Sequence, residues 1–220
     1  MTLHPSDELR HADAPMEAWW FHGLAEDGHT GWFVGLEIRA GAVDYWAGLV
    51  RAGEPYLYLE ELGTTALRSG LEIKPPEMWA GFTCDDPFRQ WSMGNEAHAV
   101  LLDDPHEAWD RAYGEKTPVT FDIEWYATSE PVAVPDGSEP TAHPGGSDRR
   151  GYEQVGEFDA EIELIEGVVS LSGTGHRRHL WGDPWADPLP ERIDAPLRRR
   201  DGSPFGLYLG VHNGSNGLRT

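Results

Sequence analysis

Apolar and polar residues alternate along most of this chain, with the two-residue period of a β-strand. Every second residue is mainly apolar over 32–38, 43–49, 119–125 and 152–164. Glycines, prolines and other turn residues separate these segments at short intervals. Strands of this length, joined by short turns, predict an antiparallel all-β fold, either a barrel or a strongly curved sandwich.

The same pattern predicts the domain organisation. We expect a polar N-terminal arm over 1–15, one β domain over 16–212 and a flexible tail over 213–220. Residues 129–149 are rich in proline, glycine and serine and predict a long loop. Strand-like sequence resumes directly afterwards, so this loop lies inside the domain. Residues 105–113 predict one short helix.

Charge and composition exclude several classes of function. The formal net charge of −21 repels phosphate backbones and anionic membrane surfaces, so we expect no nucleic-acid partner. A solvated acidic surface is the simpler explanation of this charge. Cys84 is the single cysteine, the first fourteen residues lack the apolar core of a signal peptide, and no apolar run reaches 18 residues. We therefore expect a cytoplasmic protein without a membrane span.

The densest group of histidine, arginine and tryptophan lies in residues 173–182, at the end of a predicted strand. Strand alternation turns five side chains of this segment and of the preceding strand toward the interior: Tyr152, Gln154, Arg177, His179 and Trp181. We expect the first four of them to converge at one end of the cavity. For His179 we weighed a structural hydrogen bond against an acid–base role. Its place beside Arg177 and Trp181 favours the acid–base role.

Two further polar residues interrupt apolar faces. Glu17 lies next to Trp19 and Trp20, and a carboxyl group among aromatic rings tends to have a raised pKa. The alternative is a strand-end glutamate in water. Asn95 interrupts the apolar face of residues 88–102, as either a structural hydrogen-bonding residue or a ligand contact.

Other common chemistries lack their motifs. The chain has no phosphate-binding glycine loop, no dinucleotide fingerprint and no Gly-x-Ser-x-Gly elbow. His176 and His179 point to opposite faces of an extended strand, so we expect no shared metal ion. Cys84 is expected to behave as a small buried hydrophobic residue.

Three segments resemble the carotenoid 1,2-hydratase-like superfamily, which includes hydroxyneurosporene synthase and AttH-like proteins and has a lipocalin-like fold. They are residues 17–21 (Glu-Ala-Trp-Trp-Phe), 151–154 (Gly-Tyr-Glu-Gln) and 173–182 (Gly-Thr-Gly-His-Arg-Arg-His-Leu-Trp-Gly). The resemblance spans roughly residues 16–185 in the family's order. Arg178 and Leu180 depart from the family, which has Asp and Ser there.

The resemblance implies a calycin-like barrel around an apolar cavity, in a single-domain bacterial member. Longer members have a second β domain, and a homodimer is our hypothesis for what replaces it here. A monomeric mass in light scattering would exclude that hypothesis. Characterised members hydrate, cyclise or isomerise hydrophobic isoprenoid, phenolic or polyketide-like molecules without a redox cofactor.

Our first hypothesis is therefore a cofactor-independent, metal-free hydratase, cyclase or isomerase that acts on such a hydrophobic molecule. His179 would be the acid–base group with Glu17, and Arg177, Tyr152, Gln154 and Asn95 would orient a polar group. Four tryptophans would line the cavity: Trp19, Trp20, Trp91 and Trp181. The alternatives are a non-catalytic carrier, which the missing Asp at position 178 favours, and a purely structural motif.

Overall fold

The structure is a computed structural model that describes residues 2–65, 70–109, 112–134 and 150–183, together with the backbone of 192–198 and 204–210. The first seven strands are β1 (Met16–Ala25), β2 (Thr30–Arg39), β3 (Ala42–Arg51), β4 (Tyr56–Thr65), β5 (Leu71–Ile73), β6 (Trp79–Asp86) and β7 (Gln90–Leu102). The next six are β8 (Glu115–Ala127), β9 (Val132–Ala133), β10 (Arg150–Leu164), β11 (Gly167–Gly182), β12 (Arg192–Arg198) and β13 (Pro204–Gly210).

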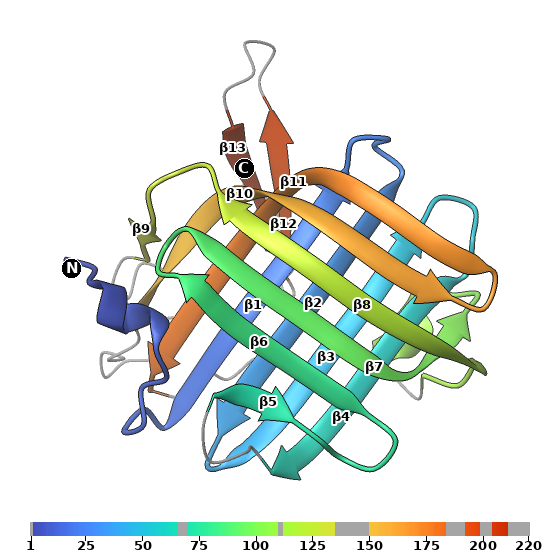
Figure 1. Cartoon of the computed structure of the whole chain (residues 1–220), viewed down its shortest axis with the longest axis horizontal. Helices are drawn as coiled ribbons and strands as arrows, with labels where there is room; N and C mark the ends of the chain where they lie inside the picture. The colour runs from blue at the N-terminus through green and yellow to red at the C-terminus, as the bar shows by residue number, and fades with distance from the viewer. Residues whose placement is uncertain are drawn as a thin grey trace.

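One antiparallel sheet curls back on itself. Its strand order is β4-β3-β2-β1-β11-β10-β8-β7-β6-β5, and a further pairing of β4 with β7 closes the ring. Figure 1 shows β6, β7, β8 and β10 crossing steeply in front of β1–β4. This arrangement confirms the predicted all-β antiparallel fold and is consistent with a lipocalin-like barrel or a strongly curved sandwich.

The inward side chains form one large aromatic core. Trp19, Phe21, Trp91, Trp125 and Phe158 are each no more than 2% exposed. From Tyr152 to Leu164 in β10 the even positions are buried, as the alternation predicted. Glycines make room for the largest rings: a Cβ at Gly156 would lie 2.4 Å from the Trp125 ring. Large rings and bare backbone are therefore matched across neighbouring strands.

The segments outside the sheet refine the predicted organisation. Pro105–Trp109 forms one turn of 3-10 helix, where a short helix was predicted. A second such turn, Pro5–Glu8, lies in the N-terminal arm, which folds back against the barrel near the start of β1 (Figure 1). Residues 135–149 of the predicted loop and the predicted tail over 213–220 lie outside the described residues. Within the described part of the chain, no helix is both long and apolar enough to cross a bilayer.

Candidate active site

The predicted convergence of side chains occurs where β1 begins and β11 ends. In the backbone register Trp19 lies opposite His179, and on the other side of β11 Tyr152 lies opposite His179 and Gln154 opposite Arg177. Strand alternation turns these side chains into the same end of the barrel. They form two adjacent clusters, because the rings of Tyr152 and His179 meet edge-on with their centroids 5.6 Å apart.

The first group, here called the Arg177 cluster, consists of Glu8, Tyr152, Gln154 and Arg177. The Arg177 guanidinium donates from Nη1 and Nη2 to the two Glu8 carboxylate oxygens, at 2.9 and 2.5 Å. It also donates from Nε and Nη2 to Gln154 Oε1, at 3.0 and 2.6 Å. The Tyr152 hydroxyl donates to Glu8 Oε2. All four side chains are at least 98% buried, so this ion pair lies in the interior of the protein.

The turn between β6 and β7 completes this cluster with backbone groups. The Phe88 N–H donates to Glu8 Oε1 at 2.6 Å, and the Phe88 carbonyl accepts from Gln154 Nε2 at 2.9 Å. Phe88 holds a φ of 60°, a left-handed conformation that is unfavourable for a bulky residue. Such strain costs about 1–3 kcal/mol, and here it is the conformation that presents the N–H to the Glu8 carboxylate.

The Arg177 cluster keeps Glu8 and Arg177 charged at neutral pH. Burial alone would raise the pKa of Glu8, but the hydrogen bonds and charge of Arg177, with those of Tyr152 and Phe88, hold the pKa below its ordinary value. Burial raises the pKa of Tyr152 well above its ordinary value. At neutral pH Glu8 is therefore a carboxylate and Tyr152 a neutral hydrogen-bond donor.

The second group, here called the His179 cluster, consists of His11, Glu17 and His179. His179 Nε2 and His11 Nδ1 lie 2.8 and 2.7 Å from the same oxygen, Glu17 Oε1. The His11 backbone N–H donates to the other Glu17 oxygen at 2.9 Å. Aromatic rings fix both imidazoles: His179 stacks on Trp19 with centroids 4.6 Å apart, and His11 stacks on Trp181 at 4.1 Å.

This arrangement decides the tautomer of His179. Burial lowers the pKa of His179, and Glu17 opposes that shift only in part, so the imidazole is neutral at pH 7. Burial would raise the pKa of Glu17, but the hydrogen bonds from His11 and His179 hold it below the ordinary value. A neutral imidazole beside a carboxylate carries its proton on the nitrogen that faces it, here Nε2. The Nδ1 lone pair is then free, and it has no hydrogen-bond partner among the described residues.

The remaining predicted site residues are divided between the interior and the outer face. Trp91 lies next to the Arg177 cluster, with the guanidinium carbon 5.6 Å from its ring centroid. Asn95 is buried elsewhere in the interior, where its Nδ2 donates to the Tyr45 hydroxyl at 2.7 Å. Trp20 does not join them, because strand alternation turns it outward, where it covers Gly35 and stacks on Trp46 at 5.2 Å.

Sequence reasoning missed Glu8 and His11. Both belong to the N-terminal arm, which carries no strand or helix periodicity, and Glu8 is 169 residues from its partner Arg177. One feature of the sequence could have revealed Glu8. A buried arginine needs a carboxylate partner, and no strand residue predicted to point inward next to Arg177 supplies one.

The His179 cluster was also tested as a metal site. Among the described residues, His11, Glu17 and His179 each offer one potential ligand atom, and these three atoms lie within 4.8 Å of one another. Ligand atoms around a tetrahedral ion with bonds of about 2.0–2.1 Å lie about 3.3 Å apart. The observed separations of 2.7 and 2.8 Å are those of hydrogen bonds instead. His176 lies on the outer face of β11, 3.6 Å from Glu153, so it does not share a site with His179.

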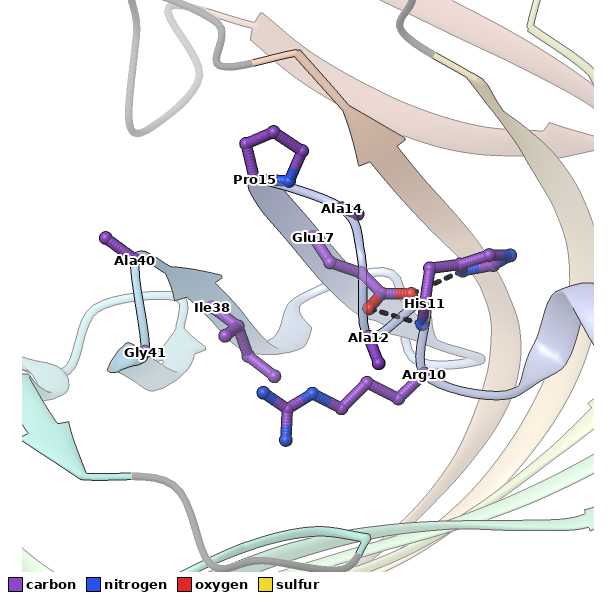
Figure 2. A pocket seen from close by; sticks show the side chains of 9 residues that line it. All are labelled: Arg10, His11, Ala12, Ala14, Pro15, Glu17, Ile38, Ala40 and Gly41. Atoms are coloured by element: carbon purple, nitrogen blue, oxygen red, sulfur yellow. Dashed lines mark hydrogen bonds and ion pairs between the residues drawn. The ribbon is translucent and has the colours of Figure 1, made fainter.

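A pocket of about 280 Å³ adjoins the His179 cluster. Figure 2 shows its two sides: the arm with His11 bonded to Glu17, and the β2–β3 turn with Ala40 and Gly41. A second, more open hollow of about 450 Å³ lies over β7 and β8, between Met78 and Val119. No residue of either cluster lines this second hollow.

Comparison with known proteins supports the fold. No family model and no curated protein matches the sequence. Among solved structures, a protein from Nitrosomonas europaea identified as a candidate AttH aligns with a TM-score of 0.56 and 13% identity, over 99% of this chain and 71% of that one. Kievitone hydratase from Nectria haematococca aligns with a TM-score of 0.55 and 11% identity, over 99% of this chain and 63% of that one.

At this level of identity the likeness shows a shared fold. It supports the fold expected from the sequence resemblance. The chain spans about two thirds of the length of these neighbours.

Proposed function

We propose that this protein is a cofactor-independent hydratase that acts on a hydrophobic small molecule, with His179 as its acid–base group. The observation that carries the proposal is the free Nδ1 lone pair of a buried, neutral His179 whose other nitrogen is bonded to a carboxylate. A base oriented in this way by a third group is the arrangement that activates hydroxyl groups and water in enzymes. The fold shared with kievitone hydratase agrees with this chemistry.

The reaction would use Nδ1 twice. As the oxygen of a water molecule bonds to one carbon of a double bond, Nδ1 accepts a proton from that water. The resulting imidazolium then delivers a proton to the neighbouring carbon. The sum is the addition of one H₂O, and neutral His179 is restored. Glu17 stabilises the transient imidazolium, because its carboxylate lies 2.8 Å from Nε2.

The surroundings suit a largely apolar substrate. Trp19 and Trp181 contact the His179 ring, and both are buried. A dry aromatic site strengthens the electrostatic effect of the Glu17 charge and protects a reactive intermediate from stray water. The Arg177 cluster lies beside the His179 ring. A polar group of the substrate would be oriented there by Arg177, Tyr152 and Gln154.

A non-catalytic carrier is the second candidate, because the same aromatic end of a barrel can hold a ligand without changing it. The buried free base favours the enzyme, since a carrier gains nothing from a desolvated Nδ1 without a partner. Cyclisation or isomerisation would use the same proton transfers without net addition of water.

The test is incubation of the protein with an apolar extract of the source organism, followed by mass spectrometry of free and bound compounds. Wild type should convert a compound into a product one water heavier, and His179→Gln should lose at least about 100-fold in rate, as expected for general acid–base catalysis. His98→Gln is the matched control, because His98 is exposed on β7. A compound bound unchanged by wild type would make the protein a carrier.

A further inference from the structure

The Arg177 cluster already binds a carboxylate, and that carboxylate comes from the arm rather than from the barrel. We propose that this cluster is the recognition site for the carboxylate group of a hydrophobic acid, and that Glu8 occupies it as an internal competitor. This inference rests on the proposed function and names its substrate class. The apolar surroundings of Arg177, which include the rings of Trp91, Trp125 and Tyr152, account for the hydrophobic character of the ligand.

The site fits a planar, two-oxygen anion. One Glu8 oxygen accepts from Arg177 Nη1 and the Tyr152 hydroxyl, and the other accepts from Arg177 Nη2 and the Phe88 N–H. Two parallel bonds from a guanidinium to a carboxylate give both energy and orientation. Gln154 holds the guanidinium in place, since its own amide group is fixed by the carbonyls of Phe88 and Ser129 at 2.9 and 2.7 Å.

Barrel residues supply every donor in this site. They come from β10, from β11 and from the β6–β7 turn, in which Phe88 is held in its unfavourable left-handed conformation. Strained backbone at a polar site is typical of ligand clamps. The donor set is therefore built into the barrel independently of which carboxylate fills it.

The arm that carries Glu8 is weakly attached by comparison. Besides Glu8, its contacts with the barrel include the bonds and stacking of His11, and a long backbone bond of 3.4 Å from Ala40 N–H to the Pro15 carbonyl. Leu9, the neighbour of Glu8, is 64% exposed, so it adds little apolar burial. A buried ion pair gains little net free energy over its desolvation cost. Another carboxylate can therefore replace Glu8 at nearly equal electrostatic cost.

The pocket between the arm and the β2–β3 turn gives the ligand a place to enter. It is bordered by Glu17, which bonds to His179, and the ring of His179 lies against Tyr152. Withdrawal of the arm would join this pocket to the Arg177 cluster. A carboxylate bound there would hold the rest of the substrate beside His179.

The first test uses the full-length chain with Glu8→Ala, which empties the site, and Asp13→Ala as the matched control on an exposed arm carboxylate. Melting temperatures are measured with sodium hexanoate, hexanol, sodium phosphate and sodium chloride. Hexanoate should raise the melting temperature of Glu8→Ala saturably, and it should raise that of wild type and Asp13→Ala only at concentrations at least about tenfold higher. Equal stabilisation by phosphate, chloride or hexanol would overturn the carboxylate assignment.

The second test measures affinity with cis-parinaric acid, a fluorescent polyene carboxylate, and with its methyl ester. If the arm is closed about nine-tenths of the time or more, Glu8→Ala should bind the acid at least about tenfold more tightly than wild type. The ester should bind both proteins alike. Equal affinity of the acid for both would refute internal competition. If Glu8→Ala fails to fold, Glu8→Gln keeps the shape of the side chain and should shift affinity in the same direction.

Both tests measure binding alone, so their outcome separates this inference from the proposed function. Carboxylate binding without turnover would leave the Arg177 site intact and refute the hydratase. Turnover of a neutral substrate, unaffected by Glu8→Ala and without carboxylate binding, would refute this inference and keep the hydratase.

Discussion

Removal of the Glu8 carboxylate and removal of the Arg177 charge should have unequal costs. In Glu8→Ala the guanidinium stays buried, because Arg177 is fixed in β11 and is 1% exposed. A buried charge without its partner costs about 3–5 kcal/mol. In Arg177→Met the opposite partner can escape, because Glu8 belongs to an arm that can carry it into water. The second variant should therefore lose less stability than the first.

The assay is urea unfolding of wild type, both single variants and the double variant, which completes a double-mutant cycle. Glu8→Ala should lose about 3 kcal/mol or more, which for a chain of this size lowers the melting temperature by roughly 6–12 °C. Adding Arg177→Met to Glu8→Ala should restore part of this loss. A loss below about 1 kcal/mol in Glu8→Ala would mean that Arg177 is solvated and would refute the buried cluster.

The other predictions concern the pH dependence of stability. The pKa values of Glu8 and Glu17 lie below the ordinary 4.5 in the folded state. The stability that these two carboxylates contribute is therefore complete above pH 4.5 and is lost as the pH falls below it. Unfolding free energies measured from pH 6 to 3 should decline in wild type, and the decline should be smaller in Glu17→Gln. An equal decline in both proteins would contradict the Glu17 assignment. Burial raises the pKa of Glu37 to about 7, although Arg39 opposes it, so stability should fall as the pH rises from 4.5 to 7. Glu37→Gln should remove that loss and stabilise the protein by about 1–3 kcal/mol at pH 8, whereas destabilisation there would contradict the raised pKa.

Alternation along the chain was enough to predict the fold class and the inward faces of the strands. It placed Tyr152, Gln154, Arg177 and His179 together because a two-residue period fixes both the face and, through hairpin pairing, the register. The outward position of Trp20 follows from the same rule. The prediction that Trp20 lines the cavity did not apply this rule, and its ring packs against Trp46 on the outer face.

The alternation pattern could not predict that Glu8 and His11 belong to the site. Periodicity describes regular strands and helices, whereas these two side chains lie in an irregular arm. The position of the arm depends on tertiary contacts, from His11 to Glu17, six positions away, and from Glu8 to Arg177, 169 positions away. The orientation of Glu17 also depends on the arm, since His11 supplies two of its hydrogen bonds. The local aromatic neighbours of Glu17 suggested a raised pKa, and the hydrogen bonds from His11 and His179 reverse that direction.

The most direct test of the hydratase is turnover of the apolar extract in water enriched in ¹⁸O, followed by mass spectrometry. We expect a product that carries one added molecule of the labelled water with wild type and with His98→Gln, and none above background with His179→Gln. Recovery of the bound compound unchanged from wild type, or equal labelling by His179→Gln, would contradict it.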